Sequence, residues 1–67
     1  MIEVLVNGRQ QPVEEGTSLA ALLESLGLAP DRVAVERNRE LVRRGEWEVV
    51  ELQSADRLEI VTFVGGG

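Results

Sequence analysis

The sequence predicts an α+β fold in which one helix covers one face of a mixed β-sheet. One stretch has helical periodicity, several short stretches are rich in β-branched residues, and the chain begins and ends with strand-like segments. A chain of 67 residues forms one domain with a small core. An amphipathic helix in such a chain must bury its apolar stripe against the sheet, which gives two layers.

The first predicted element is a β-hairpin. Residues 2–6 are rich in β-branched side chains, and Asn7-Gly8 follows them. This pair is favoured in two-residue hairpin turns, in which both central residues have positive φ. Residues 9–14 would form the returning strand, and Pro12 indicates that this strand lies at an edge of the sheet because proline donates no hydrogen bond to a ladder.

The helix is predicted over residues 18–26. Thr17 or Ser18 can cap its N-terminus through a side-chain hydroxyl. Leucines at the spacing i, i+3, i+4 and i+7 form one apolar stripe, which comprises Leu19, Leu22, Leu23 and Leu26. Gly27 stands where a left-handed residue ends a helix, and Pro30 prevents continuation.

Two further strands complete the predicted sheet. Residues 32–37 contain a Val-Ala-Val run, and residues 57–63 form the last strand. The first and last strands would lie side by side, parallel, in the middle of the sheet. This order of elements is the β-grasp, or ubiquitin-like, arrangement. The folded domain would span residues 1–63, and residues 64–67 would form a flexible C-terminal glycine tail.

The stretch between the last two strands is the least regular. A turn is expected at residues 38–39 and a short strand at residues 40–42. Val49 and Leu52 are expected to point inward. We expect Trp47 to cover the edge of the core rather than to anchor a partner.

The absent residue types narrow the possible functions. The chain has no His, Cys, Lys or Tyr, the groups on which most catalysis near neutral pH depends. We therefore expect no enzyme active site, no metal site and no bound cofactor. Twelve acidic residues against seven arginines give a net charge of −5, which disfavours nucleic-acid partners and favours basic protein surfaces.

The first ten residues lack the features of a secretory signal, and no apolar stretch is long enough to span a membrane. We expect a cytoplasmic protein that has no membrane partner and is monomeric when free.

The tail carries the one reactive group that the sequence offers, the α-carboxylate of Gly67. A carboxylate becomes an electrophile when another enzyme adenylates it with ATP. Glycines have no Cβ, so a narrow channel can close around their backbone. Extended, Val64, Gly65, Gly66 and Gly67 would reach about 13–14 Å into such a channel. The alternative is a frayed terminus without a function.

Strand alternation predicts a docking surface next to the tail. It places Leu5, Val61 and Phe63 on the sheet face away from the helix, where they would form an exposed apolar patch. Alternatively, residues 40–52 fold over part of this face. The turn at residues 37–39 is either solvated or available to acidic groups of a partner.

Four segments together resemble one known family: VNG after the first strand, EGTSLAALLESLGL across the helix, VAVERN in the third strand and DRLEIVTFVGGG at the end. They resemble the ThiS family, the sulfur carrier proteins of thiamine biosynthesis, over essentially the whole chain. Members of this family have the β-grasp fold, which agrees with the order of elements above.

The resemblance implies that the chain is a sulfur carrier and not an enzyme. An adenylyltransferase of the ThiF type would use ATP to convert the carboxylate of Gly67 into an acyl adenylate. A cysteine desulfurase system would supply sulfur as a persulfide, which displaces AMP and leads to a C-terminal thiocarboxylate. A thiazole synthase of the ThiG type would then take this sulfur. Val64, Gly65 and Gly66 would lie inside the partner during these steps.

Two alternatives stay open. The same carrier chemistry could serve another acceptor, in molybdopterin synthesis or tRNA thiolation. The small subunit of molybdopterin synthase shares the fold and the Gly-Gly end, but its usual proline-rich approach to the tail is missing here. The chain could also be a non-covalent β-grasp interaction module that binds through the patch of Leu5, Val61 and Phe63.

Overall fold

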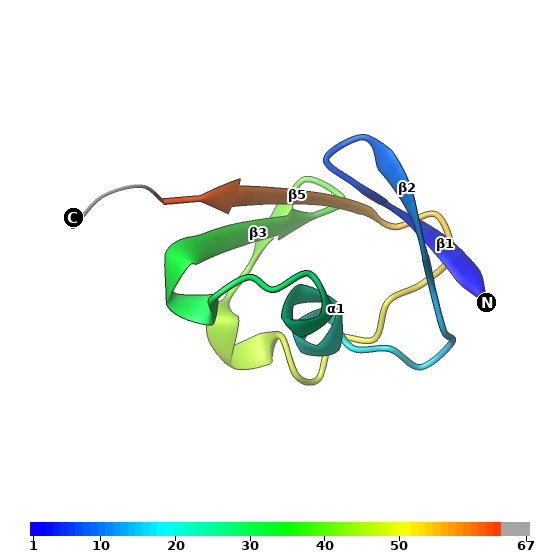
Figure 1. The fold of residues 1–67 in the computed structure, drawn as a ribbon, viewed down its shortest axis with the longest axis horizontal. Coiled ribbons are helices and arrows are strands. Elements are labelled where there is room, and N and C mark those ends of the chain that lie inside the picture. The colour runs from blue at the N-terminus through cyan, green and yellow to red at the C-terminus, as the bar shows by residue number, and fades with distance from the viewer. Residues whose placement is uncertain (64–67) are drawn as a thin grey trace.

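A computed structural model describes residues 1–63 and confirms the predicted α+β fold (Figure 1). The strands are β1 (Ile2–Val6), β2 (Arg9–Val13), β3 (Val33–Arg37), β4 (Glu40–Val42) and β5 (Arg57–Thr62). The helical elements are α1 (Leu19–Ser25) and two short 3₁₀ turns, η1 (Pro30–Arg32) and η2 (Arg44–Glu46). The strand order is β2-β1-β5-β3-β4. As predicted, β1 and β5 are parallel neighbours near the middle, while the other pairs are antiparallel.

Both hairpins close with two left-handed residues. In the β1–β2 turn, φ is 50° at Asn7 and 84° at Gly8, as the Asn-Gly pair predicts. In the β3–β4 turn, φ is 52° at Asn38 and 72° at Arg39. Asparagine tolerates this conformation better than most residues. β2 lies at the edge of the sheet, which agrees with the position of Pro12.

Helix α1 has the predicted caps. The N–H of Ala21 donates to the Ser18 hydroxyl at 3.0 Å. At the other end Gly27 has φ of 74°, and the N–H of Leu28 donates to the carbonyl of Leu23, which is the Schellman arrangement. The prediction that Leu26 belongs to the buried stripe is wrong. The helix ends one residue earlier, and Leu28 packs against the core in its place.

Trp47 covers one edge of the core, as predicted, and is 4% exposed. Its indole N–H donates to the carbonyl of Val42 at 2.9 Å. Two backbone bonds tie the segment that contains Trp47 to the start of α1: Ala20 N–H donates to the Trp47 carbonyl, and Leu19 N–H donates to the Val50 carbonyl. The segment therefore packs on the helix side of the sheet.

Of the two residues expected to point inward after Trp47, only Leu52 does. Leu52 is 1% exposed, but Val49 is 80% exposed, so the prediction for Val49 is wrong. The backbone turns tightly here, because the N–H groups of Val49 and Val50 both donate to the carbonyl of Glu46. This turn directs Val49 to solvent, and Val50 packs against the core.

One face of the sheet is left uncovered. Helix α1 and the segment around η2 lie below the sheet in Figure 1, and no helical element of the described chain lies above it. We call the uncovered side the outer face. The alternative in which residues 40–52 fold over part of this face is therefore not met. Among residues 1–63, no helix is long and apolar enough to cross a membrane.

Candidate functional site

The candidate site is the end of β5, which runs toward the side of the molecule opposite the N-terminus (Figure 1). Leu58 and Ile60 anchor this strand in the core. The N–H of Phe63 donates to the carbonyl of Arg32 at 2.7 Å, so pairing with the β3 side continues one residue past the end of β5. The four residues of the predicted tail lie outside the described residues: Val64, Gly65, Gly66 and Gly67.

On its other side, β5 is held by the side chain of Asn7. Strand β1 ends at Val6, yet the Ile60 N–H donates to Asn7 Oδ1 at 2.8 Å, and Asn7 Nδ2 donates to the Ile60 carbonyl at 3.1 Å. The Asn7 backbone N–H also donates to the Leu58 carbonyl. One side chain thus replaces the next residue of β1. The sequence indicated a turn at this position but gave no signal for the second role.

The start of β5 is fixed by a buried carboxylate, Asp56, which is 5% exposed. It accepts hydrogen bonds from the Gln53 N–H at 2.8 Å, Arg37 Nε at 2.9 Å and Asn38 Nδ2 at 3.1 Å. Asn38 Oδ1 in turn accepts the N–H of Arg57. The turn at residues 37–39 was expected to be solvated or available to a partner. Asn38 and Arg39 are exposed, as expected, but the side chains of Arg37 and Asn38 are already engaged in hydrogen bonds within the domain.

Burial alone would raise the pKa of the Asp56 carboxyl. The hydrogen bonds from Gln53, Arg37 and Asn38, together with the positive charge of Arg37, outweigh burial and hold this pKa below its ordinary value. Asp56 is therefore charged at neutral pH and locks the turn before β5. It is a structural carboxylate, and its position gave no sequence signal because two of its donors lie 18 and 19 residues away.

The predicted docking residues do not form one patch. Val61 and Phe63 are 57% and 52% exposed at the end of β5. Leu5 is half-buried and lies opposite Arg57 in the register of β1 and β5, four residues, or about 13 Å, from Val61 along the strand. Alternation predicted the correct face for Leu5 but not its distance from the chain end. The neighbour of Val61 on β3 is Ala34.

A hollow of about 360 Å³ lies beside Phe63, and we call it the tail-side hollow. It forms because β4 ends at Val42, opposite Val35, so the first residues of β3 have no strand beside them on the β4 side. Its apolar lining includes Ala34, Leu41, Trp47 and Phe63. Leu41 is 67% exposed, and Arg43 and Arg44 also line the hollow. The space suits an apolar side chain of a partner protein.

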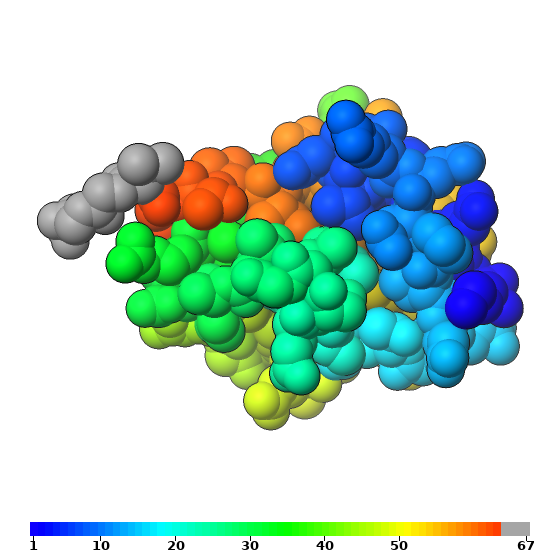
Figure 2. Space-filling view, viewed as in Figure 1, coloured from blue at the N-terminus to red at the C-terminus, as the bar shows by residue number. Residues whose placement is uncertain are grey.

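The central strand β5 is the main feature of the site. Within the described part of the chain, no three His, Cys, Asp or Glu side chains are grouped to hold a metal ion. The fold instead clamps the central strand on both sides and carries it to the surface. Figure 2 shows the atoms of β5 exposed between the surfaces of the β1–β2 hairpin and of β3.

Comparison with known proteins identifies the family to which this chain belongs. The model of the ThiS family matches residues 4–67. The sulfur carrier protein ThiS of Bacillus subtilis is 40% identical over 63 residues, which cover 92% of this chain and 96% of that protein. A solved structure, that of the thiamine biosynthesis protein ThiS from Geobacter metallireducens, superimposes with a TM-score of 0.83 at 30% identity. The match covers 98% of this chain and all of that one.

One similar protein is much longer. A thiazole synthase of Magnetococcus marinus is 47% identical over 66 residues, which cover 98% of this chain but 20% of the synthase. The chain thus spans about a fifth of the length of that relative.

Proposed function

The chain belongs to the ThiS family, and from that membership we propose that it is a sulfur carrier of thiamine biosynthesis whose Gly67 carboxylate receives the sulfur. One structural observation carries the proposal: a central strand is held by the Asn7 side chain as far as Ile60 on one side and by backbone bonding as far as Phe63 on the β3 side, immediately before the Val-Gly-Gly-Gly end of the sequence. Such a strand brings residue 63 to the surface of the domain, next to the part of the sequence that the proposal assigns to a partner.

The proposed loading proceeds in balanced steps on the partner enzymes. A ThiF-type adenylyltransferase joins the Gly67 carboxylate to the AMP part of ATP and releases pyrophosphate. The terminal sulfur of a cysteine persulfide, supplied by a desulfurase system, attacks the carbonyl carbon, and AMP leaves. A thiol then reduces the resulting acyl disulfide, which leaves the thiocarboxylate on Gly67. Glycines at residues 65–67 suit this chemistry because no side chain obstructs the attack.

We propose that the acceptor is a thiazole synthase of the ThiG type. The similarity to part of a thiazole synthase from Magnetococcus marinus supports this assignment, because a segment like this chain is there joined to a protein with that name. Transfer to an acceptor in molybdopterin synthesis or tRNA thiolation is the alternative within the same chemistry. Growth of a carrier-deficient strain without thiamine distinguishes these acceptors.

Mass spectrometry of the intact chain tests the proposal. After incubation with ATP, the adenylyltransferase and the sulfur donor, the mass should change by the replacement of one oxygen by sulfur, located at Gly67. A variant that lacks Gly67 should keep its circular dichroism spectrum and stay unmodified. The proposal fails if the wild-type mass stays constant while the Bacillus subtilis carrier is modified in the same mixture.

The exposure of Val61 and Phe63 favours a second candidate, a non-covalent interaction module. In that case the tail is passive. Deletion of residues 64–67 would leave the affinity for the partner unchanged, whereas a carrier loses its modification.

A further inference from the structure

The outer face of the sheet carries its side chains in bands that run across the strands. Leu5 lies opposite Arg57, Glu36 opposite Glu59, and Ala34 opposite Val61. Together with Arg39 from the neighbouring turn, Arg57 forms a basic band; Glu36 and Glu59 form an acidic band; Ala34 and Val61 form an apolar band. Successive bands are two residues apart on β5, which is about 7 Å. The apolar band is the one that lies next to the end of β5.

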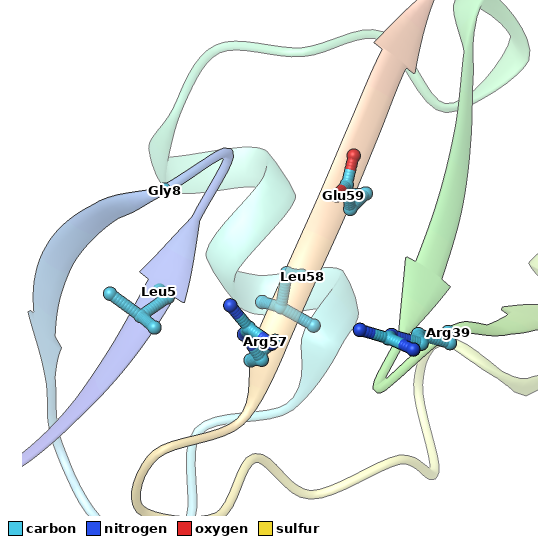
Figure 3. Close-up of a pocket in the computed structure, with 6 residues that line it drawn as sticks. All are labelled: Leu5, Gly8, Arg39, Arg57, Leu58 and Glu59. Atoms are coloured by element: carbon cyan, nitrogen blue, oxygen red, sulfur yellow. The ribbon is translucent and has the colours of Figure 1, made fainter.

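The basic band lies in a preformed hollow of about 200 Å³ between the two hairpin turns, and Glu59 of the acidic band lines the side of this hollow next to it. Figure 3 shows Arg39 extending from the β3–β4 turn toward β5, where Arg57 begins the strand, with Leu5 on the far side. The backbone at the start of β5 is fixed here, because Asn38 accepts a hydrogen bond from the Arg57 N–H and donates one to Asp56. A group that enters this hollow therefore orders little backbone on binding.

The charges of these bands are not paired with one another inside the domain. Among residues 1–63 the ion pair within 4.0 Å is that of Arg37 with Asp56, which leaves the four band residues without one. Glu36 and Glu59, moreover, are directly opposite on adjacent strands, an arrangement of like charges that destabilises a sheet. Features that oppose folding stability without internal compensation are typical of functional surfaces.

We propose that the outer face is a docking surface for a partner protein with the complementary order of charges. A carboxylate side chain of the partner enters the hollow between Arg39 and Arg57, and a basic side chain meets Glu36 and Glu59. This inference rests on the proposed function, in which the partner is the enzyme that adenylates the chain end. The order of bands fixes the orientation, because a partner turned by half a circle would place its carboxylate on the apolar band and its apolar surface on the basic band.

A second copy of the chain is a poorer occupant. Two outer faces related by a twofold axis can match the basic band of each to the acidic band of the other. That match places Val61 and Phe63 beyond the end of the facing strand, so the apolar residues next to the chain end stay uncovered. A partner enzyme covers all three bands at once and receives the end of β5 in the same contact.

Kinetics of pyrophosphate release by the adenylyltransferase test the docking surface on the full chain. Glu36→Gln should raise the thermal midpoint, because it removes repulsion from Glu59, and should raise KM about two- to five-fold with kcat unchanged, the size of effect expected for an exposed ion pair. Arg57→Gln should raise KM by a similar factor without a gain in stability. Glu24→Gln on α1 and Arg9→Gln on β2 make the same changes of charge away from the outer face and should leave KM unchanged.

The dependence of KM on salt concentration, measured in a variant of unchanged net charge, separates the contribution of the bands from that of the overall charge of the chain. Glu36→Gln, Glu59→Gln, Arg39→Gln and Arg57→Gln combined keep the net charge of the chain, so general electrostatic attraction is preserved. The combined variant should lose most of the increase in KM that the wild type shows with rising ionic strength.

Three results would overturn the inference. One is a KM that is equal in the band variants and in the two matched controls. Another is a combined variant whose KM rises with ionic strength as much as that of the wild type. The third is a wild-type dimer in sedimentation that the band substitutions dissociate. Failure of the proposed function looks different, since the wild type itself would then release no pyrophosphate.

Discussion

Asn7 and Ile60 lie 53 residues apart, yet one side chain and one backbone unit exchange two hydrogen bonds, at 2.8 and 3.1 Å. The amide of Asn7 presents an acceptor and a donor side by side, as a peptide group in a strand does. The left-handed φ of 50° at Asn7 lets the chain turn into β2 while the side chain stays in the plane of the sheet. The hairpin turn therefore also holds the strand that leads to the chain end.

Replacement of Asn7 should destabilise the domain even though its turn is preserved. Asn7→Gly keeps the positive φ at no steric cost but removes both bonds to Ile60, so the free energy of unfolding should fall by about 1–3 kcal/mol. Asn7→Asp keeps the acceptor and places a carboxylate oxygen against the Ile60 carbonyl, which should also destabilise. Urea unfolding followed by circular dichroism measures both changes.

Gln10→Gly controls for the loss of a side chain near the same turn, because Gln10 is exposed and bonds to no backbone group of β5. If Asn7→Gly were as stable as the wild type, the side-chain clamp would contribute nothing, and its two bonds would be replaced by water.

Acid should weaken the domain through Asp56. Its folded-state pKa lies below the ordinary value, so its stabilisation is fully present above the unfolded-state pKa of about 3.9 and is lost as pH falls through the folded-state pKa. Asp56→Asn removes the charge, and at pH 7 it should be less stable than the wild type by about 1–3 kcal/mol. Urea unfolding between pH 7 and pH 3 should show this difference shrinking below about pH 4.

Glu51→Gln provides the matched control, since Glu51 is an exposed acid near the same loop. A difference between wild type and Asp56→Asn that stayed constant down to pH 3 would mean that the Asp56 charge does not stabilise the fold.

The topology was predictable because its signals are local. Asn7-Gly8 and Gly27 each favour one backbone conformation through their own side chain or its absence, and each adopts it. Pro12 excludes a central strand by lacking an N–H, and β2 is an edge strand. With one helix and these turns, few arrangements of a short chain remain.

The roles of the side chains at the site were less predictable. They depend on the stagger between neighbouring strands and on contacts between residues far apart in the sequence. Alternation indicates which face Leu5 occupies, but the stagger of two parallel strands decides that it meets Arg57 and not Val61. In the same way, Asp56 gains its partners only when strands far apart in sequence come together. The prediction that Val49 points inward failed for another reason. Val49 lies in a tight turn, where buried residues recur neither with the period of a helix nor with that of a strand.

A comparison of Val49 with Leu52 tests the corrected packing of this segment. Val49 is 80% exposed, so Val49→Ala should change the free energy of unfolding by less than about 0.5 kcal/mol. Leu52 is 1% exposed, and Leu52→Ala should destabilise by about 2–5 kcal/mol through the cavity that it leaves. Equal effects of the two substitutions in urea unfolding would contradict the structure.

Phe63 should matter for the partner more than for the fold. Its side chain is 52% exposed and lines the tail-side hollow, so Phe63→Ala should lower the free energy of unfolding by about 1 kcal/mol. Its backbone bond to Arg32 does not depend on the side chain and persists. Aromatic contacts at the centre of an interface dominate its energy, so KM for adenylation should rise roughly ten-fold. Val49→Ala removes an exposed apolar side chain elsewhere; an equal KM for both variants would exclude Phe63 from the interface.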